Sequence, residues 1–208
     1  MASVVSPGPG QQMAPALPLK RFTVEEYHRM IRAGVFTGDD RFELLEGLVI
    51  SKMVRNPPHD VTLLHLTDAL RSRVPAGWHL RPQMAITTSD SEPEPDIAIV
   101  RGEVDDYLES HPRPEDIALL VEVAESTLER DRVVKGAIYA RANIRTYWII
   151  NLVDFKVEVY TNPSGPTLLP AFGRHVDFGR GEAVPLEIAG TTVKPIGVDE
   201  VLRVRRPG

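Results

Sequence analysis

The sequence predicts an α/β protein in which helices flank a central β-sheet. Residues 96–100 and 117–123 have the composition of buried strands, because aliphatic and β-branched side chains follow one another with no polar alternation. A helix is expected over 127–142, where apolar residues recur at helical spacing. Since helical and strand-like segments alternate along the chain, the favoured architecture is a sheet covered by helices.

A short helix and a hairpin are expected first. Thr23 and Glu26 have the spacing of a capping box, so a helix should begin there and end at the next glycine. Residues 42–50 are typical of a hairpin with Glu46 and Gly47 at its turn, because glycine tolerates the positive φ that a tight turn needs.

A second helix is expected over about residues 59–73, after prolines that end the hairpin's second strand. Two short strand-like pieces should follow around Pro82, and residues 101–116 should form a surface loop or a short helix. The apolar face of the second helix is predicted to consist of Val61, Leu64, Leu66, Ala69 and Leu70.

Two more strands are expected at 146–151 and 155–160. In the second of them, Lys156, Glu158 and Tyr160 alternate with apolar residues. Alternation of this kind is typical of a strand with one face in water, so these three side chains are predicted to be solvated.

The length of 208 residues fits one domain with a sizeable core. We expect that domain to span 19–208, with its core at about 22–161 and a β-rich C-terminal extension at about 162–208. Residues 1–18 are rich in Pro, Gly and Gln, a composition that predicts disorder and not a signal peptide.

Composition excludes several classes of protein. The net charge of −5 is not that of a non-specific nucleic-acid binder, so contact with DNA or RNA would need a local basic patch or a metal ion. Cysteine is absent, which excludes disulfides and thiolate metal sites. No apolar run approaches the roughly 20 residues of a membrane helix, and the cytoplasm is the expected location.

Each of the two central strands carries a carboxylate. Asp96 begins the first strand and Glu122 interrupts the second. An unpaired buried carboxylate is costly, so Glu122 is exposed at a strand end, paired, or bound to a metal. If the strands are neighbours, the two carboxylates need a cation between them, and oxygen ligands favour Mg²⁺ or Mn²⁺.

Lys135, on the helix that follows, is the candidate ammonium. Beside a phosphate it would stabilise developing negative charge and orient the attacking water. The alternative is an exposed ion pair with Asp131, four residues earlier, worth about 0.3–0.5 kcal/mol. Spacing alone leaves both interpretations open.

Several short motifs occur in a fixed order along the chain. They are Glu-Pro-Asp-Ile-Ala-Ile-Val at 94–100, Leu-Val-Glu-Val-Ala-Glu-Ser-Thr at 120–127, the pair Asp131 and Lys135, Tyr-Ala-Arg-Ala at 139–142, and Ile-Arg-Thr-Tyr-Trp at 144–148. Together with Phe42–Gly47 and the pair Pro58-His59, they resemble the Uma-type family of restriction endonucleases, which belongs to the PD-(D/E)XK nuclease superfamily. The resemblance covers about residues 22–161 and is loose beyond them.

The resemblance implies a restriction endonuclease-like fold with a mixed central sheet. It also implies a Mg²⁺-dependent endonuclease that hydrolyses phosphodiester bonds, with DNA as the expected substrate. Cutting both strands of a duplex needs two sites, which a homodimer would supply.

The same resemblance implies roles for four residues. Asp96 is similar to the metal-binding Asp of the superfamily, and Glu122 to the acid of its second strand. The superfamily's lysine usually lies two residues after that acid, where this chain has Ala124, so Lys135 on the next helix is expected to replace it. Glu43 resembles an early acid that completes the site, although a cross-strand salt bridge is an equally good interpretation.

Other polar residues near these motifs have simpler expected roles. His59 is expected to cap or pack its helix, Glu46 to serve the turn, and Glu94 and Glu125 to be solvated neighbours or to hold the metal through water. Packing is the expected role of Tyr139, Tyr147 and Trp148.

Two alternatives to the nuclease remain open from sequence. The first is a catalytically inactive module that binds nucleic acid or a protein partner, which the acidic net charge favours. The second is an enzyme that uses the same metal site on another phosphate ester. Metal titration and a panel of DNA, RNA and nucleotide substrates separate the three.

Overall fold

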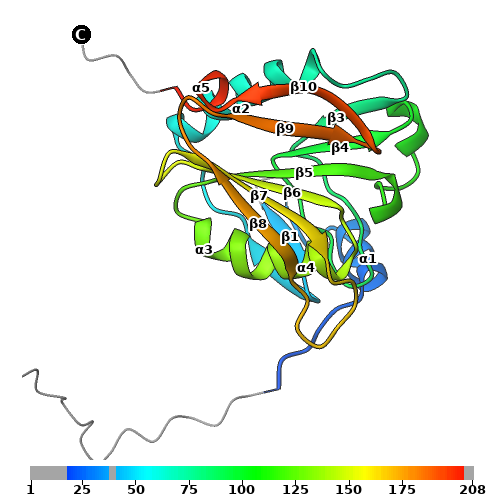
Figure 1. Ribbon diagram of the computed structural model, residues 1–208. Coiled ribbons are helices and arrows are strands. Elements are labelled where there is room, and N and C mark those ends of the chain that lie inside the picture. Colours follow the sequence, from blue (N-terminus) through cyan, green and yellow to red (C-terminus); the bar gives the residue numbers. More distant parts are fainter. Residues whose placement is uncertain (1–17, 38–40, 204–208) are drawn as a thin grey trace, which may run out of the picture.

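A six-stranded sheet runs through the centre of the molecule, in the order β3-β4-β5-β6-β7-β8 (Figure 1). The structure is a computed structural model and describes residues 18–37 and 41–203. The predicted disorder of the N-terminal segment falls on 1–17, which lie outside the described residues, as do 38–40 and 204–208. The strands are β3 (Trp78–Pro82), β4 (Ile97–Arg101), β5 (Ile117–Ala124), β6 (Thr146–Asn151), β7 (Lys156–Pro163) and β8 (Phe172–Phe178).

The sheet is mixed, as predicted. Strands β5 and β6 pair in parallel, and every other neighbouring pair in the sheet is antiparallel. All eight residues of β5 are buried, because helices or a hairpin cover both faces of the sheet at its centre.

One face of the sheet packs against α2 (Pro57–Arg71), the hairpin of β9 (Ala183–Ile188) and β10 (Thr191–Gly197), and α5 (Val198–Val201). The other face packs against α4 (Gly136–Arg141) and the hairpin of β1 (Phe42–Leu45) and β2 (Leu48–Ser51). The first helix, α1 (Val24–Arg32), lies beside this hairpin (Figure 1). No helix in the described ranges is both long enough and apolar enough to cross a membrane.

The parallel connection between β5 and β6 is a helical crossover with an irregular middle. It consists of α3 (Leu128–Arg130), a π-helical turn η3 (Asp131–Lys135), and α4. The sequence predicted one regular helix here. A π turn is wider than an α turn, and such turns often occur at functional sites.

Two local predictions are confirmed by specific contacts. The Thr23 hydroxyl accepts from the Glu26 N–H at 3.1 Å, and the Glu26 carboxylate accepts from the Thr23 N–H at 2.8 Å, which is a capping box. Glu46 and Gly47 have φ of 48° and 76°, as a tight hairpin turn requires. Both features follow from residues that are adjacent in sequence.

The predicted apolar face of α2 is confirmed for Leu66, Ala69 and Leu70 and wrong for Val61 and Leu64, which are 50% and 66% exposed. The helix starts at Pro57, where the Asn56 side chain caps it, and Thr62 and Leu63 complete the stripe that packs on the sheet. The buried side chains of this stripe are Thr62, Leu63, Leu66, Ala69 and Leu70.

The predicted solvation of Glu158 is also wrong, since this side chain on β7 is 0% exposed. Arg132, on the crossover, lies over it and donates through Nε at 3.0 Å. Around Pro82 only one strand forms, β3, because residues 83–88 leave the sheet. The predicted loop at 101–116 contains two short 3₁₀ turns, Val104–Tyr107 and Pro114–Asp116.

Candidate active site

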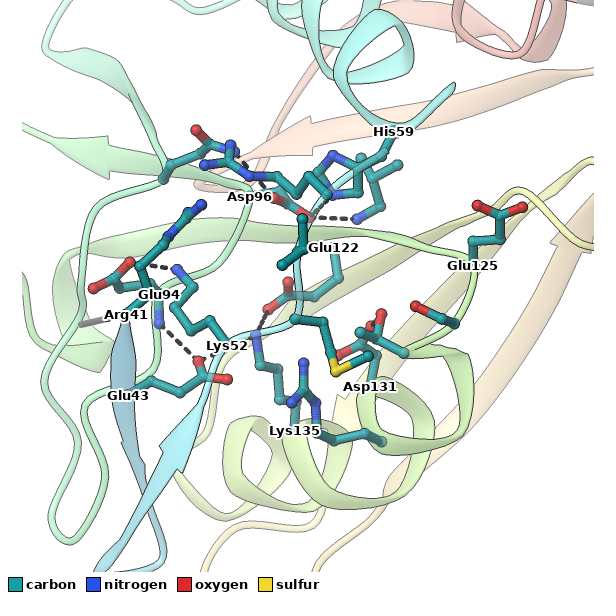
Figure 2. A pocket seen from close by; sticks show the side chains of 18 of the residues that line it. Arg41, Glu43, Lys52, His59, Glu94, Asp96, Glu122, Glu125, Asp131 and Lys135 are labelled. Carbon is teal, nitrogen blue, oxygen red and sulfur yellow. Dashed lines mark hydrogen bonds and ion pairs between the residues drawn. The ribbon is translucent and has the colours of Figure 1, made fainter. Parts of the chain in front are cut away.

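A charged pocket opens at the ends of β4 and β5, between α2, the β1–β2 hairpin and the crossover (Figure 2). Its lining contains six acidic residues, Glu43, Glu94, Asp96, Glu122, Glu125 and Asp131. It also contains five basic residues, Arg41, Lys52, Arg55, Arg130 and Lys135, together with His59. The sequence-predicted residues Asp96, Glu122, Lys135 and Glu43 all line this pocket.

The register of the sheet explains why the first two acids meet. Strands β4 and β5 are antiparallel, with Ile97 opposite Val121. Extending this register by one residue places Asp96 across from Glu122, on the same face of the sheet. The Asp96 carboxylate also accepts from the Val123 N–H at 2.9 Å, which ties the two strand ends together.

Asp96 is held as a carboxylate by its neighbours. Its Oδ2 atom lies 3.1 Å from His59 Nε2, and its Oδ1 atom lies 3.4 Å from Gln83 Nε2. Burial acts to raise the pKa of Asp96, but the hydrogen bonds from His59 and Val123 outweigh it and lower the pKa. Asp96 is therefore ionised at neutral pH.

Glu122 has a different environment. Its Oε1 atom accepts from Lys135 Nζ and from the Tyr139 hydroxyl, both at 2.8 Å. Burial raises the pKa of Glu122 to about 8, and the negative charges of Asp131 and Asp96 add to the increase while Lys135 opposes it. This carboxyl group therefore gains a proton far more readily than Asp96 does.

Lys135 reaches the acids from the π turn (Figure 2). Its Nζ atom lies 2.8 Å from Glu122 Oε1 and 3.4 Å from Glu43 Oε2. Burial acts to lower the pKa of Lys135, but the carboxylates of Glu122, Glu43 and Asp131 outweigh it and raise the pKa. The amine is therefore an ammonium at neutral pH.

The alternative of an exposed pair between Asp131 and Lys135 is wrong. Both side chains are buried. Asp131 Oδ2 accepts from the Thr127 hydroxyl at 2.5 Å, while Lys135 bonds to Glu122 instead. Both residues, four apart, lie on the pocket side of the crossover.

Glu43 enters the pocket from β1. Its Oε2 atom accepts from the Glu94 N–H at 3.3 Å, and its Oε1 atom is buried with no hydrogen-bond partner in the described part of the chain. Lys135, which forms an ion pair with it at 3.4 Å, comes from the crossover and not from the neighbouring strand. A cross-strand salt bridge is therefore not its role.

The remaining predicted residues divide between the pocket and its surroundings. The His59 backbone N–H donates to the Asn56 side chain as expected for a helix start, while its ring contacts Asp96. Glu94 and Glu125 pair with Lys52 and Asn56. Three further outcomes are that Glu46 accepts from Arg141 at 2.9 Å, the Tyr147 hydroxyl donates to the Asp131 carbonyl at 3.1 Å, and Trp148 is buried in the core.

Sequence reasoning missed Asp131 as a pocket residue. Its Oδ1 atom is buried without a hydrogen-bond partner among the described residues, and burial raises its pKa. The spacing Thr127, Asp131, Lys135, four residues each, was visible in the sequence. That spacing places Asp131 and Lys135 on one face of the helix, but it does not show which face lies toward the pocket.

The donor chemistry of the pocket fits a hard divalent cation. Within 18–37 and 41–203 no three His, Asp or Glu side chains are already arranged to hold a metal ion. Asp96 nevertheless stays ionised, Glu122 faces the same pocket, and Asp131 Oδ1 is an acceptor that lacks a donor. These are oxygen ligands of the kind that Mg²⁺ and Mn²⁺ prefer.

Comparison with known proteins agrees with the fold. A family model described as "Uma2: Putative restriction endonuclease" matches residues 24–191. Among solved structures, the crystal structure of a "putative nuclease belonging to DUF820" from Anabaena variabilis is similar, with a TM-score of 0.66 and 14% identity over 87% of this chain and 97% of that one. At this identity the likeness concerns the fold alone. No curated protein matches the chain.

Proposed function

The chain belongs to the Uma2 family, described as putative restriction endonucleases, and on that premise we propose that it is a divalent-metal-dependent endonuclease that hydrolyses phosphodiester bonds in DNA. The observation that carries the proposal is the meeting of Asp96, Glu122 and Lys135 in one pocket. They come from two strands and a helical crossover, and sheet register together with a π turn brings them together.

Asp96 and Glu122 are the residues that would hold the metal, with Asp131 close enough in the pocket to assist. A divalent cation bound there would polarise the scissile phosphate and lower the pKa of a bound water. His59 and the Val123 N–H keep Asp96 ionised and oriented, so the ligand is ready before the cation arrives.

Lys135 acts as a charge stabiliser in this proposal. Because its pKa is raised, Nζ keeps its proton and cannot serve as the base that activates water. An ammonium beside the phosphate stabilises the charge that develops on the phosphoryl oxygens. Tyr139 donates to Glu122 and fixes the orientation of that carboxyl group.

The test uses the full chain with supercoiled plasmid DNA, with and without Mg²⁺ or Mn²⁺. We expect metal-dependent conversion to nicked or linear DNA, and loss of both cleavage and calorimetric Mn²⁺ binding in the Glu122→Ala variant with an unchanged far-UV spectrum. Glu187→Ala, an exposed carboxylate on β9, is the matched control. Retained metal-dependent cleavage in Glu122→Ala would remove Glu122 from the mechanism.

A second candidate is a non-catalytic module that uses the same fold to bind nucleic acid or a protein. The contact between Lys135 and Glu122 favours it, because the ammonium already occupies one oxygen of that carboxyl group. Absence of a Mn²⁺ binding heat together with absence of cleavage would select this candidate. The homodimer needed to cut both strands is part of the first proposal, and sedimentation of the chain on DNA tests it.

A further inference from the structure

Three arginines line the pocket in addition to its two lysines. Arg41 directly precedes β1, Arg55 lies in the loop before α2, and Arg130 ends α3. Throughout 18–37 and 41–203, none of these three guanidinium groups forms a hydrogen bond or an ion pair, and Arg130 Nε is buried without a partner. A buried donor with no acceptor is costly, which points to an acceptor that arrives with a ligand.

The two lysines of the same pocket, in contrast, both form ion pairs with carboxylates. Lys52 is paired with Glu94, and Lys135 with Glu122. Outside the pocket, Arg73 holds Glu200 in a two-pronged contact, whereas Arg81 Nε is buried without a partner among the described residues. With respect to the residues that the structure describes, the unpaired cations of the pocket are therefore its arginines, whose planar fork matches a phosphate group.

The position of these arginines fits a chain of phosphates better than a single one. Arg41 lies on the hairpin side of the pocket with Glu43 and Glu94, whereas Arg130 directly precedes Asp131 on the crossover side (Figure 2). In Figure 2, Glu122 lies between these two sides. A polyanion approaching the acids of the pocket is repelled unless cations beside them offset that charge.

We call Arg41, Arg55 and Arg130 the rim of the pocket. Apolar side chains lie next to Arg55 in this rim. Met53 and Val54 line the pocket mouth and are 53% and 92% exposed. They stand between Lys52 and Arg55 in the loop that joins β2 to α2. Exposed apolar side chains beside phosphate-binding cations are suited to contact the sugars or bases of a nucleic-acid strand.

We propose that Arg41, Arg55 and Arg130 bind the phosphates that flank the scissile one, so that the pocket takes an oligonucleotide strand and not a mononucleotide. This inference rests on the proposed nuclease function for the position of the scissile phosphate. The binding of an oligonucleotide by the arginines can be measured without any cleavage.

The experiment measures binding of a fluorescein-labelled 12-nucleotide DNA strand by anisotropy, in a Glu122→Gln background and at several salt concentrations. The test variant changes Arg41, Arg55 and Arg130 to Gln together. The control variant changes Arg29, Arg71 and Arg174 to Gln, which removes the same charge from surfaces outside the pocket. Thermal melting monitored by circular dichroism verifies that each variant is folded.

We expect the rim variant to raise the Kd at least tenfold and to lower the slope of log K against log salt by about 2, as the loss of three phosphate contacts on a single strand predicts. The control variant should change the Kd and the salt slope much less. A third variant, with lysine at the three rim positions, should recover most of the salt slope but not all of the affinity, because lysine keeps the charge and lacks the fork. A labelled mononucleotide should bind at least tenfold more weakly than the 12-mer.

Equal losses in the rim and control variants, or unchanged binding in the rim variant, would overturn the proposal. So would equal affinity for the mononucleotide and the 12-mer. These failures differ from that of the nuclease proposal, which is an absence of metal-dependent cleavage by the wild-type chain. Arginine-dependent binding without cleavage would support phosphate binding by the three arginines and would contradict the proposed nuclease function.

Discussion

Two buried glutamates on the same face of the sheet have opposite environments. Glu122 on β5 pairs across to Ile149 on β6, and Ile149 pairs across to Glu158 on β7, so the two acids lie in one row. The π turn serves both, through Lys135 for Glu122 and Arg132 for Glu158. One helical turn therefore connects the candidate active site with a second charged cluster.

The difference lies in the balance of donors and like charges. Glu158 accepts from both prongs of Arg132, from Asn151 Nδ2 at 2.7 Å and from the Tyr160 hydroxyl at 2.7 Å. Burial acts to raise its pKa, but these hydrogen bonds outweigh burial and lower the pKa to about 2. Glu122 has fewer donors and two acidic neighbours, so burial prevails and its pKa rises to about 8.

Glu158 is thus an acid that stabilises the fold, whereas Glu122 is an acid that remains able to bind a ligand. A fully hydrogen-bonded carboxylate has no remaining capacity for a ligand, whereas a carboxylate among other acids gains from a cation. Active sites are commonly the places where such unfavourable arrangements persist. We expect Glu158 to govern stability and Glu122 to govern activity, and the following predictions test that division.

The largest expected effect is on cleavage. Glu122→Gln should reduce metal-dependent DNA cleavage by about 10²–10³-fold, because it removes a charged group from the reacting centre. Glu158→Gln, assayed in parallel with plasmid DNA at a temperature where both variants are folded, should change the rate less than about threefold. Similar losses in the two variants would contradict the division.

Stability should show the reverse order. Glu158→Ala removes the buried partner of Arg132, leaves it the more distant Asp154 at 3.8 Å, and should lower the free energy of unfolding by about 3 kcal/mol. Glu122→Ala removes the acceptor of Lys135 and Tyr139, but it relieves repulsion with Asp96 and Asp131 and leaves Lys135 3.4 Å from Glu43, so its cost should be smaller than that of Glu158→Ala. Urea unfolding followed by fluorescence of the two tryptophans measures both values.

The pH dependence of stability should have opposite signs for the two acids. The folded-state pKa of Glu158, about 2, lies below its ordinary value of 4.5, so its stabilisation is present above pH 4.5 and is lost as the pH falls toward 2. The pKa of Glu122, about 8, lies above 4.5, so its contribution is present below pH 4.5 and is lost as the pH rises toward 8. Urea titrations should show slopes of at most about 1.4 kcal/mol per pH unit, and each Gln variant should lack only its own slope.

The smallest expected effect comes from Arg132→Lys. Lysine keeps the charge beside Glu158 but loses the two-pronged contact, which should cost about 1 kcal/mol. Arg141→Lys, at the more exposed pair with Glu46, is the control and should cost less. A loss in Arg132→Lys no greater than that in the control would show that the guanidinium geometry at Glu158 is unimportant.

Features set by neighbouring residues could be predicted from the sequence. The capping box at Thr23, the turn at Glu46 and the two apolar strands depend on short-range patterns. The placement of Asp96 and Glu122 in one pocket followed from two strand predictions and the assumption that these strands are neighbours. Their roles in metal binding stay predictions.

Features set by distant residues could not be predicted. The burial of Glu158 depends on Arg132, which is 26 positions earlier and reaches it only because the crossover lies over β7. Periodicity within β7 correctly indicated a strand, but it could not show what covers that strand. The same limit applies to Asp131, because the sequence does not show which face of the crossover lies toward the pocket.

The π turn also has a consequence for how this chain can evolve. Successive residues of a helix are offset by about 100° around its axis, so inserting or deleting one residue between Arg132 and Lys135 would rotate Lys135 relative to Arg132 by more than a quarter of a circle. Arg132 and Lys135 could then no longer both meet their acids on the sheet. Point substitutions in this stretch can accumulate one at a time. A change of length would require simultaneous substitutions on β5 and β7, which carry the two acids.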